Sequence, residues 1–192
     1  LIIYILFKMS TIRLFSIFDM FKFNNVNLDL LTETYATSFY GKYIAKWSEY
    51  NVSAQNSNGM IEAYILGKVE GEKDNEQKKN WHGHVTAVTV APYFRRQGLA
   101  RSLMNFLEEV SEKIHNGFYV DLFVRSTNKV AINMYKNLGY DVYQVVEKYY
   151  SSDGSQPEED AYDMRKSLKR DVKGECSKPT GKTIQPNEIE FV

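Results

Sequence analysis

The stretch from His84 to Leu107 constrains the fold most, because a strand pattern, a basic turn and a helix pattern follow one another in it without interruption. Residues 85–90 alternate β-branched with small side chains, which predicts a buried strand. Pro92 ends this strand because proline lacks the N–H that a sheet ladder needs. The next apolar residues recur at helical spacing, as Leu99, Leu103, Phe106, Leu107, Val110 and Ile114. We therefore expect a mixed α/β (α+β) domain.

The turn between this strand and helix reads Arg95-Arg96-Gln97-Gly98-Leu99-Ala100. Gly98 leaves no Cβ between the backbone and a bound group, and Ala100 keeps the next turn small. The first turn of a helix has unpaired N–H groups, and the helix dipole favours a negative charge there. The sequence therefore predicts an anion site, such as one for a diphosphate, at this turn.

Composition limits the other classes of function. Lys and Arg together number 24, as do Asp and Glu, so no overall field draws the chain to nucleic acid or to an anionic membrane. The single cysteine, Cys176, excludes an internal disulfide and a cysteine zinc cluster, and it is consistent with a reducing compartment. We expect no metal site. A chain of 192 residues suits one domain with a sizeable core.

The chain divides into three segments. Residues 1–8 open with an apolar run at 1–7, which is too short for a bilayer span of about 20 residues. No basic segment precedes this run, as one would in a signal peptide. We interpret it as an artefactual extension before Met9, with a truncated membrane anchor as the alternative. Residues 9–169 are expected to form the domain, and the polar residues 170–192 a disordered tail.

Local patterns predict the order β-α-α-β-β-β-α-β-α-β-β. Asp19 is the expected N-cap of the first helix, and Asn128 or Thr127 that of the last, which Gly139 closes. Asn51 and Ser53 stand where a strand calls for apolar residues, so we expect them to weaken one sheet edge. The strands are expected at about 12–15, 50–54, 60–68, 85–90, 118–124, 140–149 and 161–164, and the helices at about 20–26, 39–47, 99–114 and 129–138.

The basic turn also resembles the Arg/Gln-x-x-Gly-x-Gly/Ala signature of the GNAT acetyltransferases, which seat the pyrophosphate of acetyl-CoA on its amides. Beyond this turn, pieces that resemble the NatB catalytic subunits, a branch of that family, are found at 23–29, 31–35, 81–86, 121–125, 133–136, 147–150 and 160–166. The resemblance covers roughly residues 9–169. It implies a GNAT fold whose sheet is splayed to admit acetyl-CoA. It also implies acetylation of N-terminal Met before Asp, Glu, Asn or Gln, in the cytoplasm, with a helical-repeat auxiliary subunit at the ribosome.

The resemblance assigns three sets of residues. The catalytic set is His84 and Tyr135, with Tyr135 protonating the leaving thiolate. The cofactor-binding set is Val88, Val90, Arg95, Arg96, Gln97, Gly98, Leu99, Ala100 and Asn128. The substrate-binding set is Glu33, Tyr35, His84, Thr86, Tyr149 and Tyr150. Simpler roles stay open, namely a structural histidine at 84, a helix cap at 128 and a core tyrosine at 135. We assign His82 to the opposite strand face from His84, with a structural role.

The residue types agree with an α-amine as acceptor. An α-amino group has a pKa of about 8, against about 10.4 for lysine, so it needs less help from a base. Residues 81–92 contain no Asp or Glu and offer His84 instead, although a base could come from another strand. Cys176 lies in the polar tail, so direct transfer in a ternary complex is expected. The alternatives are a GNAT enzyme acting on lysine or a small amine, and a non-catalytic GNAT-fold scaffold subunit.

Overall fold

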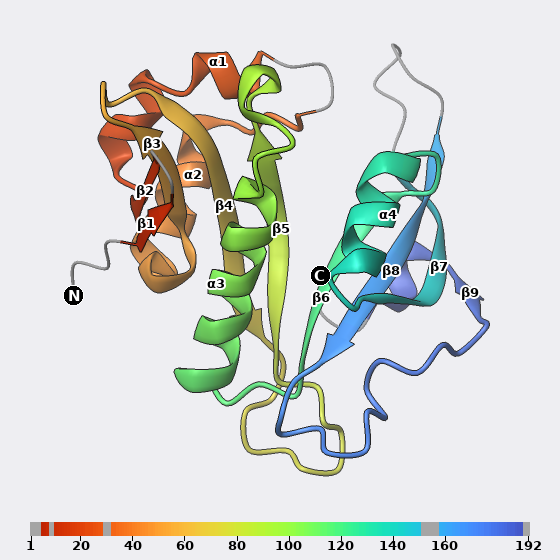
Figure 1. The fold of residues 1–192 in the computed structure, drawn as a ribbon. Coiled ribbons are helices and arrows are strands. Elements are labelled where there is room, and N and C mark those ends of the chain that lie inside the picture. The colour runs from red at the N-terminus through yellow and green to blue at the C-terminus, as the bar shows by residue number, and fades with distance from the viewer. Residues whose placement is uncertain (1–4, 8–9, 29–31, 151–157, 190–192) are drawn as a thin grey trace. The chain divides into compact units, whose positions relative to one another are not determined.

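A computed structural model describes residues 5–7, 10–28, 32–150 and 158–189 (Figure 1). The chain forms two compact units, one from residues 1–68 and 85–110 and the other from residues 69–84 and 111–192. Strand β5 (His82–Val90) and helix α3 (Leu99–Lys113) begin in one unit and end in the other. The bounds of β5 and α3 confirm the predicted strand–turn–helix stretch, and the short 3-10 helix η3 (Pro92–Phe94) lies between them.

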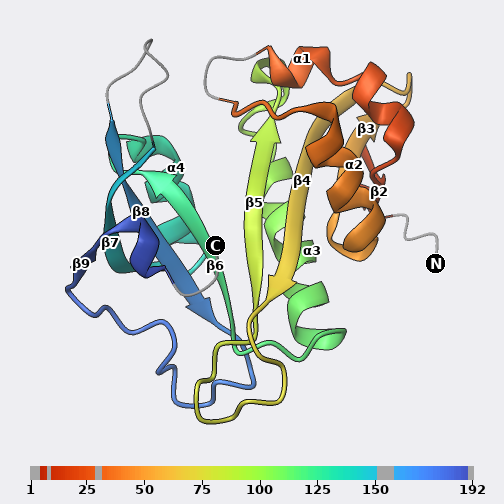
Figure 2. The ribbon, with the colours of Figure 1, turned by 180° about the vertical axis from the view of Figure 1, so that it is seen from behind.

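The first unit contains an antiparallel run of β1 (Ile5–Phe7), β2 (Ser10–Leu14), β3 (Val52–Asn56) and β4 (Ile61–Glu70). Helix α2 (Thr37–Lys46) lies on one face of these strands and α3 on the other (Figures 1 and 2). The core beneath α2 is largely aromatic, and its buried members are Phe15, Phe23, Val26, Tyr40, Tyr43, Ile61, Tyr64, Leu66 and Ala91.

The second unit pairs β6 (Tyr119–Arg125) with β8 (Glu159–Ser167) and β8 with β7 (Asp141–Tyr150), both antiparallel. Helix α4 (Lys129–Asn137) begins at the predicted cap, where the Asn128 side chain accepts a hydrogen bond from the Ala131 amide. It ends in a Schellman motif, because Gly139 adopts a φ of 92° and the amides of Gly139 and Tyr140 donate back to Lys136 and Tyr135.

Two predicted helix boundaries are wrong. The helix expected at 20–26 is divided into the 3-10 helix η1 (Ile17–Phe21) and the short α1 (Asn24–Asn27). Its N-cap is Ser16, whereas Asp19 is the third residue of the capping box and pairs with Arg13 at 2.7 Å. Helix α3 stops at Lys113, which leaves Ile114 62% exposed.

Asn51 stabilises the part of the sheet that it was expected to weaken, and this part is not an edge, because β3 pairs with both β2 and β4. The residue precedes β3, after the 3-10 helix η2 (Ser48–Tyr50), and is fully buried. Its amide nitrogen donates to the carbonyl oxygens of Tyr43 and Trp47, at 2.9 and 2.6 Å, while its oxygen accepts from the Gly67 amide at 3.0 Å. The side chain therefore ties the end of α2 to β4. Ser53 matches the expectation better, since its buried hydroxyl has no partner among the described residues.

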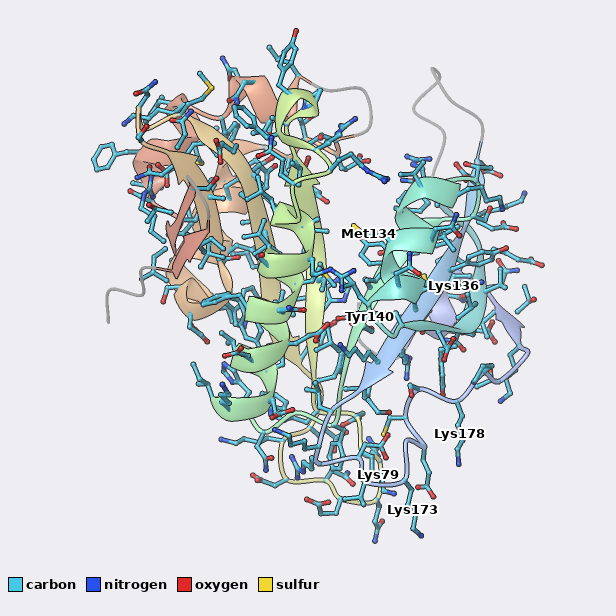
Figure 3. All side chains as sticks on the ribbon, in the orientation of Figure 1. Lys79, Met134, Lys136, Tyr140, Lys173 and Lys178 are labelled. Atoms are coloured by element: carbon cyan, nitrogen blue, oxygen red, sulfur yellow. The ribbon has the colours of Figure 1, made fainter. Side chains whose placement is uncertain are left out.

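The C-terminal segment has defined structure up to residue 189, which differs from the expected disorder. The short strand β9 (Thr183–Ile184) pairs in parallel with β7 and precedes the 3-10 helix η4 (Pro186–Glu188). Asp171 accepts hydrogen bonds from the Ser167 hydroxyl and from two amides, and Lys79 pairs with Glu175 at 2.7 Å near Lys173 and Lys178 (Figure 3). Polar composition alone was misleading because polar groups here pair with one another.

At the other end, Ile5–Phe7, inside the segment expected to be artefactual, pairs with β2. Residues 1–4 and 8 of that segment lie outside the described residues. Among the described residues, no helix combines the length and the apolar character needed to cross a membrane.

Candidate functional site

The basic turn combines a tight backbone with an exposed helix start. Arg96 and Gly98 have positive φ values of 64° and 86°, which fold the chain tightly before α3 begins at Leu99. Leu99 is 2% exposed and anchors the helix start, whereas residues 95–98 are exposed. The Ser102 amide donates to the Gly98 carbonyl, so the amides before it belong to the unpaired first turn. The predicted cofactor residues Arg95 to Ala100 are thus brought together here, after the half-buried Val88 and Val90 of β5.

A second group of predicted residues lies in the same unit. The Thr86 hydroxyl donates to the Tyr43 hydroxyl at 2.9 Å. Tyr35 stacks on Phe39 with ring centroids 4.3 Å apart, and its hydroxyl reaches the Thr86 carbonyl at 3.5 Å. Tyr35 and Thr86, both assigned to substrate, therefore lie side by side on an aromatic wall. Glu33, also assigned to substrate, is exposed in the preceding loop.

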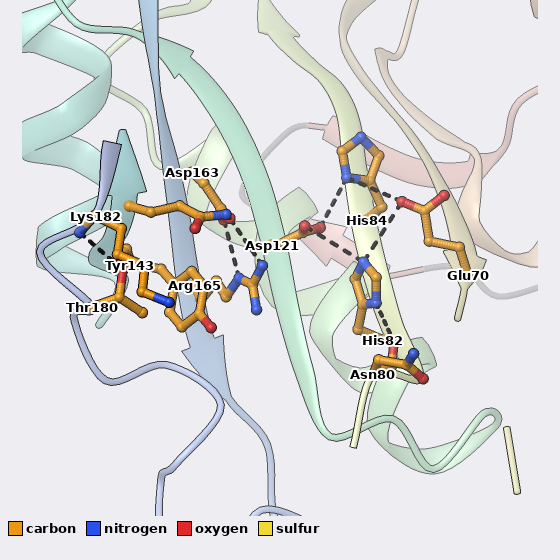
Figure 4. Close-up of polar contacts among 11 residues, drawn as sticks. Glu70, Asn80, His82, His84, Asp121, Tyr143, Asp163, Arg165, Thr180 and Lys182 are labelled. Atoms are coloured by element: carbon orange, nitrogen blue, oxygen red, sulfur yellow. Dashed lines mark hydrogen bonds and ion pairs between the residues drawn. The ribbon is translucent and has the colours of Figure 1, made fainter. Parts of the chain in front are cut away.

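In the second unit, His84 belongs to a buried cluster of two histidines and two carboxylates (Figure 4). Nδ1 of His84 lies 2.8 Å from Oδ1 of Asp121 and 3.8 Å from Oε1 of Glu70. Nε2 of His82 lies 3.4 Å from Oδ2 of Asp121 and 3.6 Å from Oε1 of Glu70, and Nδ1 of His82 donates to the Asn80 carbonyl at 2.6 Å. His82 and Asp121 are 1% and 4% exposed.

Charge inside this cluster decides which groups are ionised. Burial acts to raise the pKa of Asp121, but the two histidines hold it well below its usual value, so Asp121 is a carboxylate. Burial likewise acts to lower the pKa of His82, and the Asp121 charge with hydrogen bonds to Asp121, Glu70 and Asn80 raises it to about 9. An ionised Asp121 can only accept, so Nδ1 of His84 carries a proton and Nε2 is the remaining nitrogen.

Sequence reasoning misassigned His82 and missed both carboxylates. His82 is two residues from His84, so it faces the same side of the strand and contacts the same carboxylates. Glu70 was missed because the strand expected to end at residue 68 continues to Glu70, the last residue of β4. Asp121 could have been found from its position inside the apolar run 118–124, because a charge in a buried strand needs a partner.

The remaining predicted residues of this unit fall in two places. Tyr149 stacks on Phe123 at 4.7 Å, the Tyr150 hydroxyl donates to the Phe123 carbonyl, and Phe123 lies 5.8 Å from the ring of His84. These tyrosines therefore continue the surface that starts at His84. Tyr135, on α4, is 8% exposed with its ring edge against Tyr140, and burial raises its pKa well above the usual value. Its phenol therefore stays protonated at neutral pH.

Asn128 has the capping role that was left open, and its contact with a cofactor stays a prediction. Among the described residues, no group of three or more His, Cys, Asp or Glu side chains could hold a metal ion.

Known proteins resemble this chain along most of its length. The model of the Acetyltransferase (GNAT) family matches residues 20–140. The chain is 52% identical to N-alpha-acetyltransferase 20 of Dictyostelium discoideum, over 95% of this chain and 100% of that one. It is 50% identical to the N-terminal acetyltransferase B complex catalytic subunit NAA20 of Arabidopsis thaliana, over 95% of this chain and 99% of that one.

Among solved structures, Chaetomium thermophilum Naa20 in complex with a bisubstrate analogue has a TM-score of 0.83 at 45% identity, covering 92% of this chain and 97% of that one. The NatB complex bound to a bisubstrate inhibitor gives a TM-score of 0.80 at 37% identity, covering 94% of this chain and 99% of that one. The chain therefore belongs to the GNAT acetyltransferase family, in the branch of the NatB catalytic subunits.

Proposed function

We propose that this enzyme transfers acetyl from acetyl-CoA to the α-amino group of an N-terminal Met followed by Asp, Glu, Asn or Gln. The observation that carries the proposal is the hydrogen bond from Nδ1 of His84 to Asp121, at 2.8 Å, in a chain half identical to NatB catalytic subunits. A histidine fixed in this way presents one defined nitrogen to a substrate, as in the carboxylate–histidine pairs of other transferases and hydrolases.

The proposed reaction is direct transfer in a ternary complex. The neutral amine nitrogen bonds to the acetyl carbon, and the bond between that carbon and sulfur breaks. Nε2 of His84 accepts the proton that the amine loses, and the Tyr135 phenol gives its proton to the departing thiolate. Exchange with water restores both groups. Since an α-amine has a pKa of about 8, an appreciable fraction is neutral at physiological pH without a stronger base.

Acetyl-CoA supplies the acetyl thioester, and the turn Arg95 to Ala100 is proposed to hold its pyrophosphate. The support is the exposed turn with two positive φ values at the start of a fifteen-residue helix. Val88, Val90 and Asn128 complete the proposed cofactor-binding set. The polar second side chain of the substrate is assigned to Thr86 and His84, and the peptide backbone to Glu33, Tyr35, Tyr149 and Tyr150.

The Gly98→Val variant tests the phosphate site. A valine at a φ of 86° is strained, by about 1–2 kcal/mol, and its side chain projects where the diphosphate must approach. We expect acetyl-CoA to bind roughly five- to thirtyfold more weakly, as measured by calorimetry. Gly59→Val is the matched control, because Gly59 has a φ of 77° in the turn between β3 and β4 and a Cβ there meets nothing within 4 Å. Unchanged affinity in Gly98→Val would contradict the assignment.

A peptide panel tests the proposed substrate. Purified enzyme is given labelled acetyl-CoA and peptides that begin Met-Asp, Met-Glu, Met-Asn, Met-Gln, Met-Leu and Ser-Glu, with a blocked peptide that carries an internal lysine. Transfer confined to the first four is the expected result. Transfer to lysine would replace the substrate claim with the lysine alternative. If no peptide reacts while acetyl-CoA binds, co-expression with the auxiliary subunit distinguishes an incomplete enzyme from a scaffold.

The auxiliary subunit is proposed to cover an apolar patch near the N-terminus. The patch comprises five exposed residues around η1 and α1, which are Leu14, Ile17, Phe18, Phe21 and Leu28. Phe18, Phe21 and Leu28 are 69%, 80% and 82% exposed, and such a group of large apolar side chains marks a protein contact. We also propose that the partner is a helical-repeat protein and that the complex acts at the ribosome in the cytoplasm. Co-sedimentation of the complex with ribosomes tests that location.

The double substitution of Phe18 and Phe21 by serine tests the patch. Both side chains are already exposed in the chain alone, so its stability should change little, whereas the complex loses two aromatic anchors. We expect binding to the auxiliary subunit to weaken about a hundredfold or more. Val130→Ser is the control, since Val130 is 80% exposed on α4 in the other unit. Equal losses in both variants, or none in either, would exclude the patch as the contact surface.

A further inference from the structure

The proposed role of His84 leaves the neighbouring His82 without a task, although His82 is the more deeply buried of the two. It is 1% exposed, and both of its ring nitrogens face acceptors. Nδ1 meets the Asn80 carbonyl oxygen, which cannot donate a proton, so Nδ1 carries one. Nε2 faces Asp121 and Glu70 together, and a lone pair pointing at two carboxylates would be repelled. The geometry therefore requires protons on both nitrogens.

Stacked rings fix the plane of His82. Its imidazole lies 4.5 Å from the Tyr119 ring at an interplanar angle of 5°. The Arg165 guanidinium lies 4.7 Å from the same Tyr119 ring and 3.6 Å from the Tyr143 ring. Arg165 also pairs with Asp163 at 2.9 Å (Figure 4). Rotation of His82 would break this stack as well as its bond to Asn80. The imidazole is thus held with Nε2 towards Asp121.

Asp121 divides its two oxygens between the two histidines. Oδ2 is nearest to His82, and Oδ1 accepts from Nδ1 of His84. His82 is also the cation that compensates this carboxylate, which is 4% exposed and would otherwise be costly to ionise. A protonated Asp121 could donate to Nδ1 of His84, which would move the His84 proton to Nε2 and remove its acceptor.

We propose that His82 is a positioning residue for the reaction, because its buried imidazolium keeps Asp121 ionised and oriented so that His84 presents Nε2 as an acceptor. The proposal rests on the proposed function in one respect, which is that Nε2 of His84 accepts a proton from the substrate amine. The groups that face His82 are Glu70 from β4, Tyr119 and Asp121 from β6, and the Asn80 carbonyl before β5. His84 of β5 shares both carboxylates with it, and Arg165 of β8 contacts the Tyr119 ring.

The first test reads the histidine protons directly in the unmodified full chain. With ¹⁵N-labelled histidine, two-bond couplings identify which ring nitrogens carry hydrogen. We expect His82 to keep both protons from pH 6 until it titrates near pH 9, and His84 to appear as the Nδ1–H tautomer when neutral. A His82 that loses its proton near pH 6.5, where ordinary histidines titrate, would overturn the proposal. This readout does not depend on the substrate, so it can fail while the proposed function stands.

The second test compares three substitutions at two histidines. His82→Asn keeps a donor for Asn80 but removes the charge and the contact with Asp121, whereas His82→Gln keeps a neutral donor towards Asp121. We expect kcat/KM for a Met-Asp peptide to fall roughly ten- to hundredfold in His82→Asn, part of the 10²–10⁴-fold that a positioned base contributes. His82→Gln should recover part of the lost kcat/KM, and the affinity for acetyl-CoA should not change in either His82 variant. His115→Asn is the control, since His115 follows α3, packs against the Trp81 ring and has no proposed part in the reaction.

A pH series separates positioning from general structural damage. The folded pKa of His82 is above its unfolded value, so its contribution to stability is complete below pH 6.5 and is lost as the pH rises through about 9. Urea unfolding should show this decline in the wild type and not in His82→Asn. In His82→Asn, the ¹⁵N couplings of His84 should also show a larger share of the tautomer that carries its proton on Nε2. Unchanged His84 couplings together with reduced activity would overturn the positioning role.

Discussion

The Tyr135→Phe variant is expected to lose about 10²–10³-fold in kcat, which corresponds to about 3–4 kcal/mol of transition-state stabilisation. The KM for the peptide and the KM for acetyl-CoA should change little. The phenol of Tyr135 is proposed to protonate the departing thiolate, and burial keeps that phenol protonated at neutral pH. Phenylalanine preserves the ring packing against Tyr140, at 6.1 Å between centroids, and removes only the hydroxyl. The loss should therefore appear in the chemical step and not in folding or binding.

Steady-state kinetics with a Met-Asp peptide, and single-turnover measurements with bound acetyl-CoA, would resolve that step. Tyr140→Phe is the matched control, because this tyrosine follows the same helix, is 1% exposed and has no proposed part in the reaction. An unchanged single-turnover rate in Tyr135→Phe would show that Tyr135 only packs in the core and does not protonate the thiolate. A rise in the KM of the peptide alone would instead indicate a substrate contact.

Features set by neighbours in sequence were predicted well. The strand ending before Pro92, the turn at Gly98, the Asn128 cap and the Gly139 stop all depend on residues within one or two turns of one another. Pattern reasoning can assess such local requirements because the residue type itself determines the backbone conformation or the cap.

Features that join distant segments were not predictable in the same way. His84 and Asp121 are 37 positions apart, and nothing in either strand pattern states that they meet. The ordered C-terminal segment was missed for a related reason, since Lys79 and its partner Glu175 are 96 positions apart and meet only once the chain has folded. A buried charge inside an apolar run was the one available signal, and it predicts a partner without naming it.

Asn51 shows that a polar residue in an apolar pattern can be a stabilising contact, and its replacement gives the second large prediction. Leucine has a similar size but makes none of the three hydrogen bonds of the asparagine side chain. The Tyr43 and Trp47 carbonyls keep the bonds that they accept from the Trp47 and Tyr50 amides. The Gly67 amide, in contrast, loses the partner that the side chain supplies.

We expect Asn51→Leu to lower the free energy of unfolding by about 3–5 kcal/mol, because the buried Gly67 amide loses its acceptor and two further hydrogen bonds are lost. Domains of this size are stable by only about 5–15 kcal/mol, so urea unfolding should show a much lower midpoint at an unchanged slope. Ser53→Ala is the internal control two residues away, since it removes a buried hydroxyl that has no partner among the described residues. That change should be neutral or stabilising. If both variants lost similar stability, burial at the start of β3 and not the Asn51 hydrogen bonds would be responsible.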